Sequence, residues 1–283
     1  MRVVILGNAN RPGVIEETDR LLPIIAQHAQ VVTVDLHQST DLSVLDFDVA
    51  LVLGGDGAIL RAARQMAYQQ RPVLGVNLGK LGFLADLNTD ELCAVFRRVV
   101  QGDYRLTRHL MFECTWNDGN EKRTVLGLNE VLVHTDQSCH MIDLNLGVDG
   151  ENVTSFRGDG LLVSPPIGST GHSLSAGGPI LSQELEAFVI TPICAHTLVS
   201  RPVVESCAKT YTISLTSAYA KGVLVIDGQE HIPLRKGETV SVRKAPVGFC
   251  LIKVPGKSFY QTLRDKLGWG IQPNYRLEHL AAE

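Results

Sequence analysis

Several signatures of common protein classes are missing from this sequence of 283 residues. No apolar run reaches the roughly 18 residues that a transmembrane helix needs, and Met1 to Leu6 lead into a strand pattern without the apolar run and cleavage site of a signal peptide. The six cysteines form no CxxC pair, so neither a zinc site nor a disulfide framework is expected. A net charge of −4 argues against a nucleic-acid-binding face. These absences predict a cytoplasmic protein that binds neither nucleic acid nor membrane.

The familiar phosphate-binding motifs and metal clusters are also missing. The sequence contains no GxxxxGK[ST] loop, and no GxGxxG follows a strand pattern. Its nine histidines lack the spacing of metal ligands, since His134 and His140 have no third partner nearby. No metal site made of protein side chains is therefore predicted.

The first hundred residues alternate strand-like and helix-like segments. Short apolar runs predict strands at Arg2–Leu6, Val31–Asp35, Val49–Leu53 and Pro72–Val76. Apolar residues at helical spacing predict helices at Val14–His28, Ala58–Tyr68 and Asp90–Val100. Alternation of this kind is typical of a parallel sheet covered on both faces. Residues 1–102 are therefore expected to form an α/β nucleotide-binding domain.

The pattern changes near Gly102-Asp103, beyond which short β-rich runs dominate. These runs are Arg105–Trp116, Val125–Thr135, Met141–Asp149, Leu161–Val163, Phe188–Thr191, Tyr211–Leu215, Val223–Ile226, Val240–Val242 and Phe249–Val254. Turn signals such as Asp149-Gly150 and Asp227-Gly228 separate several of them. Residues 103–257 therefore predict a mainly β domain. A helix from Ser258 to Leu267, capped by Gly268, begins a C-terminal segment, 258–283, that is expected to return to the first domain.

The sharpest local feature is Gly54-Gly55-Asp56-Gly57, placed between a predicted strand and a predicted helix. Glycine lets a ligand approach the backbone closely, and the N–H groups at the start of a helix favour phosphate. A carboxylate in that place would repel phosphate, so Asp56 indicates chemistry or metal handling. The alternative is a simple turn in which Asp56 caps the helix.

A second glycine-rich segment runs from Gly168 to Pro179 and combines four hydroxyl residues with four glycines. It follows the rigid Pro165-Pro166 pair, and it could offer backbone amides and hydroxyls to a nucleotide. The alternative is a surface loop with a helix N-cap at Ser169 or Thr170.

Isolated polar residues provide weaker signals. Asn129 and Glu130 interrupt an apolar strand pattern, where neighbouring side chains would point to opposite faces. Because burying both without partners would be costly, either an edge position or a ligand is expected. Asp159 lies between two glycines after Arg157, and by itself it indicates only a turn.

Taken in order, these motifs resemble the NAD kinase family in its bacterial form. The resemblance covers nearly the whole chain and rests on Gly54–Gly57, Asn129-Glu130, Asp159-Gly160 and the Gly168–Pro179 segment. The segment Asn77–Leu84 is similar to a strand-to-helix turn of the family. Diacylglycerol-type lipid kinases carry a motif like Gly-Gly-Asp-Gly, so the ordered set is the specific signal.

The resemblance implies a reaction and a set of residues. The reaction is Mg²⁺-dependent transfer of a phosphoryl group from ATP, or from another donor such as polyphosphate, to the 2′-hydroxyl of NAD's adenosine ribose. Asp56 is implied as the general base, and Gly54, Gly55 and Gly57 as phosphate-binding residues. The implied NAD-binding residues are Asp56, Gly57, Asn129, Glu130, His140, Arg157, Asp159, Thr170, Gly171, His172, Ser173, Leu174, Ser175 and Gln229. The family also implies a homodimer or homotetramer, in which His140 and Arg157 can act across a subunit interface.

The chain departs from the usual family pattern in the second glycine-rich segment and at the residue directly before it. Ile167 replaces a hydroxyl residue, Gly171 stands at an alanine position, and His172 stands where the family has tyrosine. Because an imidazole covers less area than a phenol ring, these changes bear on substrate affinity more than on reaction type. Two alternatives stay open: a lipid kinase of the diacylglycerol or sphingosine type, and a non-catalytic sensor of NAD or NADP.

Overall fold

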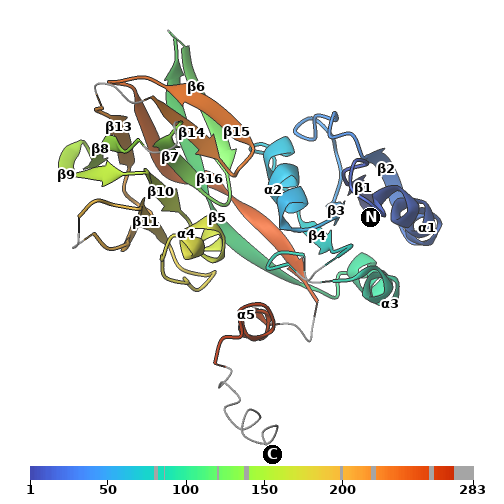
Figure 1. Cartoon of the computed structure of the whole chain (residues 1–283). Coiled ribbons are helices and arrows are strands. Elements are labelled where there is room, and N and C mark those ends of the chain that lie inside the picture. The colour runs from blue at the N-terminus through green and yellow to red at the C-terminus, as the bar shows by residue number, and fades with distance from the viewer. Residues whose placement is uncertain are drawn as a thin grey trace, which may run out of the picture.

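The computed structural model describes residues 1–79, 82–85, 87–119, 121–136, 140–197, 200–217, 221–254 and 258–270. Lys80 and Leu81 of the segment Asn77–Leu84, Cys139, and the end of the predicted C-terminal segment, 271–283, lie outside these residues. The described chain consists of an α/β part and a β part, with helix α2 between them (Figure 1). None of its helices is long and apolar enough to cross a membrane.

The α/β part is a parallel sheet with helices on both faces. Its strands are β1 (Arg2–Leu6), β2 (Gln30–Asp35), β3 (Val49–Leu53) and β4 (Val73–Val76), in the order β2-β1-β3-β4. Alternate strand residues point to opposite faces, so Val3 packs with α1 (Val14–Ala26) and α3 (Thr89–Val100). Val4 packs on the other face, with α2 (Asp56–Gln65). The predicted doubly covered parallel sheet is confirmed.

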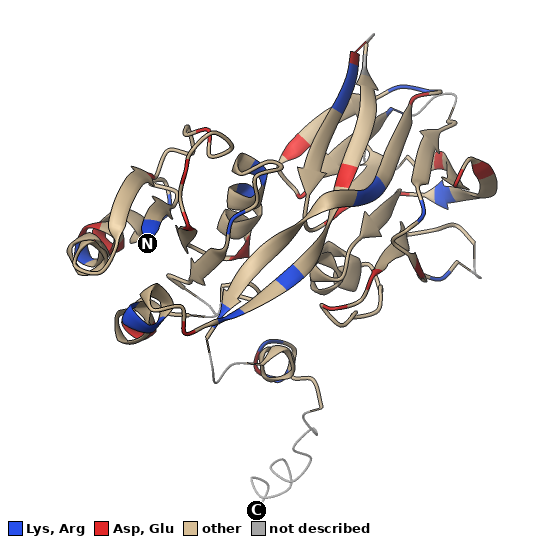
Figure 2. Cartoon of the chain, turned by 180° about the vertical axis from the view of Figure 1, so that it is seen from behind, with Lys and Arg blue, Asp and Glu red and all other residues tan. Residues whose placement is uncertain are grey.

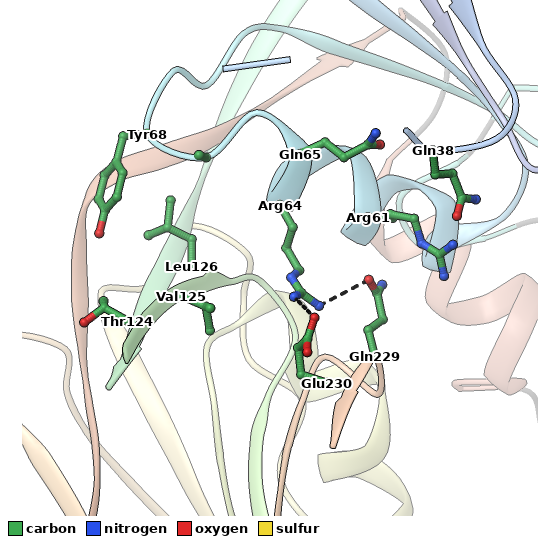
Figure 3. Close-up of a pocket in the computed structure, with 11 residues that line it drawn as sticks. Gln38, Arg61, Arg64, Gln65, Tyr68, Thr124, Val125, Leu126, Gln229 and Glu230 are labelled. Atoms are coloured by element: carbon green, nitrogen blue, oxygen red, sulfur yellow. Dashed lines mark hydrogen bonds and ion pairs between the residues drawn. The ribbon is translucent and has the colours of Figure 1, made fainter. Parts of the chain in front are cut away.

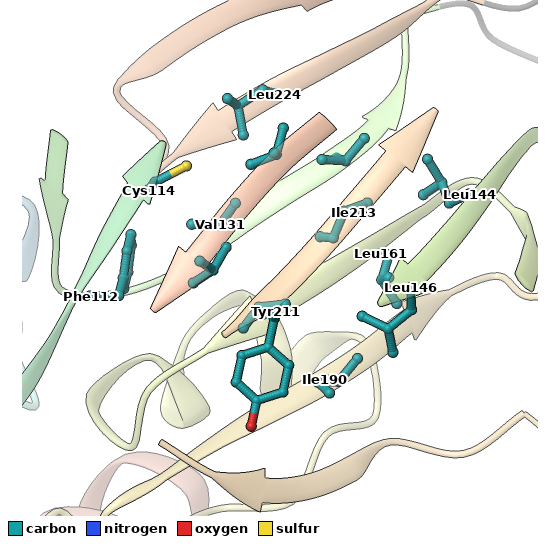
Figure 4. Close-up of a cluster of buried hydrophobic side chains, with 14 of the residues drawn as sticks. Phe112, Cys114, Val131, Leu144, Leu146, Leu161, Ile190, Tyr211, Ile213 and Leu224 are labelled. Atoms are coloured by element: carbon teal, nitrogen blue, oxygen red, sulfur yellow. The ribbon is translucent and has the colours of Figure 1, made fainter. Parts of the chain in front are cut away.

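The β part is a sandwich of two packed sheets. The first contains β5 (Arg105–Asp118), β6 (Glu121–Gly127), β8 (Ile142–Val148), β9 (Glu151–Gly158), β13 (Tyr211–Leu215) and β16 (Thr239–Lys253). The second contains β7 (Val131–Thr135), β10 (Gly160–Ser164), β11 (Ala187–Ile193), β12 (Val203–Ser206), β14 (Gly222–Ile226) and β15 (Glu230–Leu234). Phe112 and Tyr211 from the first sheet bury against Leu161 and Ile190 from the second (Figure 4). The mainly β fold predicted for this region is confirmed.

One long strand joins the two parts. The sequence predicts separate strands at Val240–Val242 and Phe249–Val254, but the structure has the single strand β16, whose pairing with β5 shifts register between Lys244 and Gly248. Its first half pairs with β13, and Leu251 near its end pairs with Val73 of β4. The sheet of the α/β part therefore continues into the sandwich, and this fixes the carboxyl ends of the parallel strands relative to the β part.

The predicted strand Val125–Thr135 is wrong in one respect, because the chain breaks at residues 128–130 into β6 and β7. The cause is the carboxylate of Asp227, whose Oδ1 accepts hydrogen bonds from the backbone N–H groups of Asn129 at 2.7 Å and Glu130 at 3.1 Å. Leu128 donates to both carboxylate oxygens, at 3.2 and 3.0 Å. Since these N–H groups are used, they are not available to a sheet ladder.

The C-terminal helix α5 (Phe259–Leu267) ends at Gly268, which has the left-handed φ of 64° of a C-cap. Lys266 of this helix places its Nζ 4.5 Å from the centre of the Phe83 ring. Acidic and basic positions are interspersed along both parts of the chain (Figure 2). The cysteines of the described residues are free thiols.

Candidate active site

The Gly54–Gly57 turn forms where β3 ends and α2 begins. Gly54 has a φ of 143°, a conformation that side-chain-bearing residues rarely adopt. The N-cap of α2 is Gly55, and no side chain caps its first N–H groups. Asp56 is the first helical residue, so the alternative in which its carboxylate caps the helix is wrong.

The carboxylate of Asp56 holds a neighbouring turn. Its Oδ2 accepts a hydrogen bond from the N–H of Phe83 at 2.9 Å, and its Oδ1 accepts from Leu84 at 2.9 Å and Ala85 at 3.2 Å. A Cβ on Gly82 would lie 2.1 Å from Oδ1, so the close approach requires glycine there. The half-buried Asp56 is thus fixed in orientation by the segment Asn77–Leu84 and the residue after it.

A cavity of ≈ 550 Å³ opens beside this turn, at the carboxyl ends of the parallel strands. Open parallel sheets bind their ligands in this position. Its lining includes Asn8, Arg11, Gly54, Gly55, Gly57, Arg61, Asn77, Gly79, Asp227, Gly228 and Gln229. The structure therefore brings the three predicted phosphate-binding glycines together with Gln229 of the β part. We call this space the glycine cavity.

Buried carboxylates support the β side of the site. Asp227 and Glu130 are each 5% exposed. Burial raises the pKa of Asp227, against the opposing effect of its backbone hydrogen bonds. Burial, together with the nearby Asp227, raises the pKa of Glu130 to about 7, although a hydrogen bond from the Asn129 side chain acts in the opposite direction.

The second glycine-rich segment folds over Asn129. Ser164 Oγ donates to the backbone oxygen of Asn129 at 2.8 Å. A Cβ on Gly168 would lie 1.7 Å from that oxygen, and one on Gly171 would lie 2.9 Å from Asn129 Nδ2. The absence of side chains at these two glycines lets the segment pack directly against Asn129.

The hydroxyl residues of this segment differ in accessibility. Within η1 (Ile167–Thr170) and α4 (His172–Ser175), Thr170 Oγ1 donates to Ile167 O at 3.0 Å, and the fully buried Ser173 Oγ lies 3.1 Å from Thr191 Oγ1. His172 and Ser175 are exposed, and Leu174 is partly buried. The fold thus uses the hydroxyls of Thr170 and Ser173 internally, while His172 and Ser175 face outward.

Three further predicted residues lie at the far end of β10 from Asn129. Asp159 precedes β10, and its backbone oxygen accepts from Thr135 N at 3.0 Å. Arg157 Nε lies 3.8 Å from Asp143 Oδ1, and His140 is exposed. Because a strand rises about 3.3 Å per residue, β10 separates this group from Asn129 by roughly 13 Å. One chain therefore does not bring His140, Arg157 and Asp159 together with Asn129.

Sequence reasoning missed Arg11, Arg61 and Asp227, all of which line the glycine cavity. Arg61 could have been found, because it lies four residues after Gly57 and residues at that spacing share a helix face. Asp227 was noted only as part of a turn signal, and its contacts with residues 128–130 are too distant in sequence to be read from spacing.

An α/β sheet with an uncapped, glycine-rich helix start, facing a β part across a cavity, defines a nucleotide-binding enzyme. Residues 16–104 match the family model described as ATP-NAD kinase N-terminal domain, and residues 128–254 match the ATP-NAD kinase C-terminal domain. The chain belongs to the ATP-NAD kinase family of phosphotransferases, which confirms the resemblance inferred from the ordered motifs.

Individual relatives agree with this assignment. The chain is 42% identical over 269 residues to the NAD kinase of Rhodopirellula baltica, covering 95% of this chain and 86% of the relative. It is 36% identical to that of Natranaerobius thermophilus, covering 95% and 98%.

Solved structures share the fold. A yeast NADH kinase complexed with NADH superposes with a TM-score of 0.84 at 24% identity, covering 98% of this chain and 90% of that one. An NAD kinase from Archaeoglobus fulgidus in complex with ATP superposes with a TM-score of 0.75 at 25% identity, covering 95% and 98%.

Proposed function

We propose that the chain catalyses Mg²⁺-dependent transfer of a phosphoryl group from ATP to the 2′-hydroxyl of NAD's adenosine ribose, which gives NADP. The observation that carries this proposal is the position of Asp56. Its carboxylate is held by three backbone hydrogen bonds from the turn of residues 83–85, and its chain neighbours Gly55 and Gly57 line the glycine cavity. Phosphoryl transfer depends mainly on such positioning of the reacting groups.

The hydrogen bonds of Asp56 fix its orientation and leave acceptor capacity for a substrate hydroxyl. A carboxylate has about four lone-pair sites, and three backbone N–H groups occupy part of this capacity. The remaining capacity can accept the hydrogen bond of the 2′-hydroxyl. Asp56 would then orient the attacking oxygen and accept its proton as the new P–O bond forms.

Magnesium would be held mainly by the donor. No group of three or more His, Cys, Asp or Glu side chains with the arrangement of a metal site occurs within the described ranges. Mg²⁺ usually keeps several of its waters and binds through substrate phosphates. The chemistry that Mg²⁺ would supply there is neutralisation of the charge on the phosphate oxygens.

We also propose that the NAD site is completed by a second subunit. Asn129 and Glu130 lie beside the second glycine-rich segment, whereas His140, Arg157 and Asp159 lie at the other end of β10. All of these residues can contact one NAD molecule if the distant group comes from a partner chain. A homodimer or homotetramer would supply it.

The first test is incubation of the purified chain with NAD, ATP and Mg²⁺, with NADP read by an NADP-specific dehydrogenase. Wild-type chain should form NADP. Asp56→Asn should lower kcat by about 10²- to 10⁴-fold, the usual contribution of a general base. Near-normal turnover by this variant would remove Asp56 from the mechanism.

Asp35→Asn is the matched control, because Asp35 also accepts backbone hydrogen bonds from a turn at a strand end, those of His37, Gln38 and Thr40. It should lose stability but keep turnover. NAD binding without turnover in the wild-type chain would favour the sensor alternative, and phosphorylation of diacylglycerol in vesicles would favour the lipid-kinase alternative.

A further inference from the structure

A cavity of ≈ 820 Å³ lies away from the glycine cavity, where the pairing of β5 with β16 is interrupted. The register shifts between Lys244 and Gly248, so that residues 245–247 of β16 stand where β5 has only Met111. Extra residues of this kind bend a strand and redirect its side chains. The turn of residues 207–210 between β12 and β13 also lines this space, which we call the basic cavity.

The charged side chains of the basic cavity are mostly positive. Its described lining includes one acidic residue, Glu186, and four basic residues, which are Arg108, Lys209, Arg243 and Lys244. The basic residues come from β5, from the β12–β13 turn and from β16, and they are exposed or partly exposed. Because the whole chain has a net charge of −4, this excess of cations is a local feature. Cations gathered in one cavity repel each other, and a bound anion relieves that repulsion.

One carboxylate of the chain itself already lies beside two of these cations. Lys244 Nζ bonds the carboxylate of Glu186, and Cys207 Sγ donates to the same group at 3.0 Å. These hydrogen bonds lower the pKa of Glu186, with a smaller contribution from Arg108. A Cβ on Gly248 would lie 2.6 Å from Arg108 Nε, so the guanidinium lies directly against the backbone of the interruption. Within the described chain Arg108 has no ion pair at contact distance, so its N–H donors are available to a further carboxylate.

A second arginine of the cavity is held in place before any ligand binds. Arg243 Nε donates to Glu113 Oε2 at 2.6 Å, and the buried Glu113 also accepts from the hydroxyl of Tyr68 at 2.8 Å. Tyr68 follows α2 and lines a separate cavity along that helix (Figure 3). A guanidinium has five N–H donors, and among the described residues the Nη atoms of Arg243 have no hydrogen-bond partner. An arginine fixed in this way loses little freedom when it binds an anion.

We propose that the basic cavity binds a small polycarboxylate, a molecule with two or three carboxylate groups on a short carbon frame. Arg108 and Arg243 bind its carboxylate groups through guanidinium N–H donors, whose planar arrangement matches that group. Lys244 adds a third cation, and the volume lies within the usual range for small-molecule pockets. The basic cavity shares no described lining residue with the glycine cavity, so this second site is independent of the proposed reaction.

Two variants should change the affinity of this site in opposite directions. Calorimetric titration of propane-1,2,3-tricarboxylate into the full chain, at low ionic strength and without Mg²⁺, should show saturable binding. Arg108→Ala should weaken it by about fivefold, between the contributions of an exposed ion pair and of a charged hydrogen bond. Glu186→Gln removes the one acidic lining residue, keeps the shape of the side chain and should strengthen binding by about threefold. A gain of affinity cannot arise from misfolding.

Two controls separate this site from other cationic positions. Arg97→Ala, at an exposed position on α3, and Arg61→Ala, in the glycine cavity, should both leave the affinity for the tricarboxylate unchanged. Binding should weaken in 0.5 M NaCl for every variant, because salt screens exposed charges over about 4 Å at that concentration.

The proposal is overturned if the wild-type chain shows no saturable binding, or if Arg61→Ala weakens binding while Arg108→Ala does not. Weaker binding by Glu186→Gln would also overturn it. Tighter binding of inorganic pyrophosphate, lost in Arg108→Ala but kept in Arg61→Ala, would overturn the assignment to carboxylates. Since no turnover is measured, failure of the chain to form NADP would bear on the proposed function alone.

Discussion

Two aspartates, one in each part of the molecule, perform the same structural task with different consequences. Asp56 in the α/β part accepts the N–H groups of residues 83–85, and Asp227 in the β part accepts those of residues 128–130. Asp227 is 5% exposed and has a raised pKa because it is buried. Asp56 stays half-exposed at a helix start.

The difference shows that the hydrogen-bond pattern alone does not mark a catalytic residue. Both carboxylates fix a turn of the site, but Asp56 is half-exposed whereas Asp227 is almost fully buried. Asp227 positions Asn129 and Glu130 through their backbones, so we expect it to act on stability and NAD affinity together.

The largest effect is expected for Asp227→Asn. An amide has one acceptor oxygen, and its NH₂ group would face the N–H of Leu128, which bonds both carboxylate oxygens. Loss of about two charge-assisted hydrogen bonds should cost roughly 3–6 kcal/mol of unfolding free energy. Calorimetry should show a Tm lower by more than about 6 °C. A Tm within about 1 °C of wild type would contradict the role assigned to Asp227.

Much of the α/β part and of the turn around Asp56 could be predicted from the sequence, because both depend on local signals. The apolar runs, the helical spacing and the glycines around Asp56 each report on neighbours close in the chain. They predicted the parallel sheet and the strand-to-helix turn. The predicted helix begins at Ala58, whereas α2 in the structure begins two residues earlier, at Asp56.

The turn that Asp227 holds at residues 128–130 could not be predicted, because its hydrogen bonds join residues almost a hundred positions apart. The continuous strand expected through Asn129 breaks for that reason, and the joined strand β16 depends on a register shift that no local pattern reveals. Arg61 is the intermediate case, since its helical spacing from Gly57 was readable but its place in the lining of the glycine cavity was not.

Glu130 should make the free energy of unfolding depend on pH, because it is buried close to the carboxylate of Asp227. Its pKa in the folded chain is about 7, against an ordinary value of 4.5, because burial and the nearby Asp227 disfavour its charge. The folded state therefore holds this proton more tightly, and stability is full below about pH 4.5 and falls as pH rises through 7. The loss should approach ~3 kcal/mol. Thermal unfolding of Glu130→Gln at pH 5 and pH 8 should show a smaller fall than wild type, and parallel curves would contradict the assignment.

The smallest effect is expected for Gly171→Ala, which acts on the Asn129 side chain while Asp227 still holds its backbone. The new Cβ would lie 2.9 Å from Asn129 Nδ2 and 3.3 Å from its Oδ1, so the amide must turn away. Because the backbone N–H of Asn129 stays bonded to Asp227 at 2.7 Å, the turn itself should remain in place. We expect an unchanged Tm and a change in KM for NAD of about threefold, worth roughly 0.6 kcal/mol. Steady-state kinetics with NAD as the varied substrate measures this directly. A large fall in Tm for Gly171→Ala would mean that the packing of the glycine-rich segment, rather than Asp227, holds Asn129 in position.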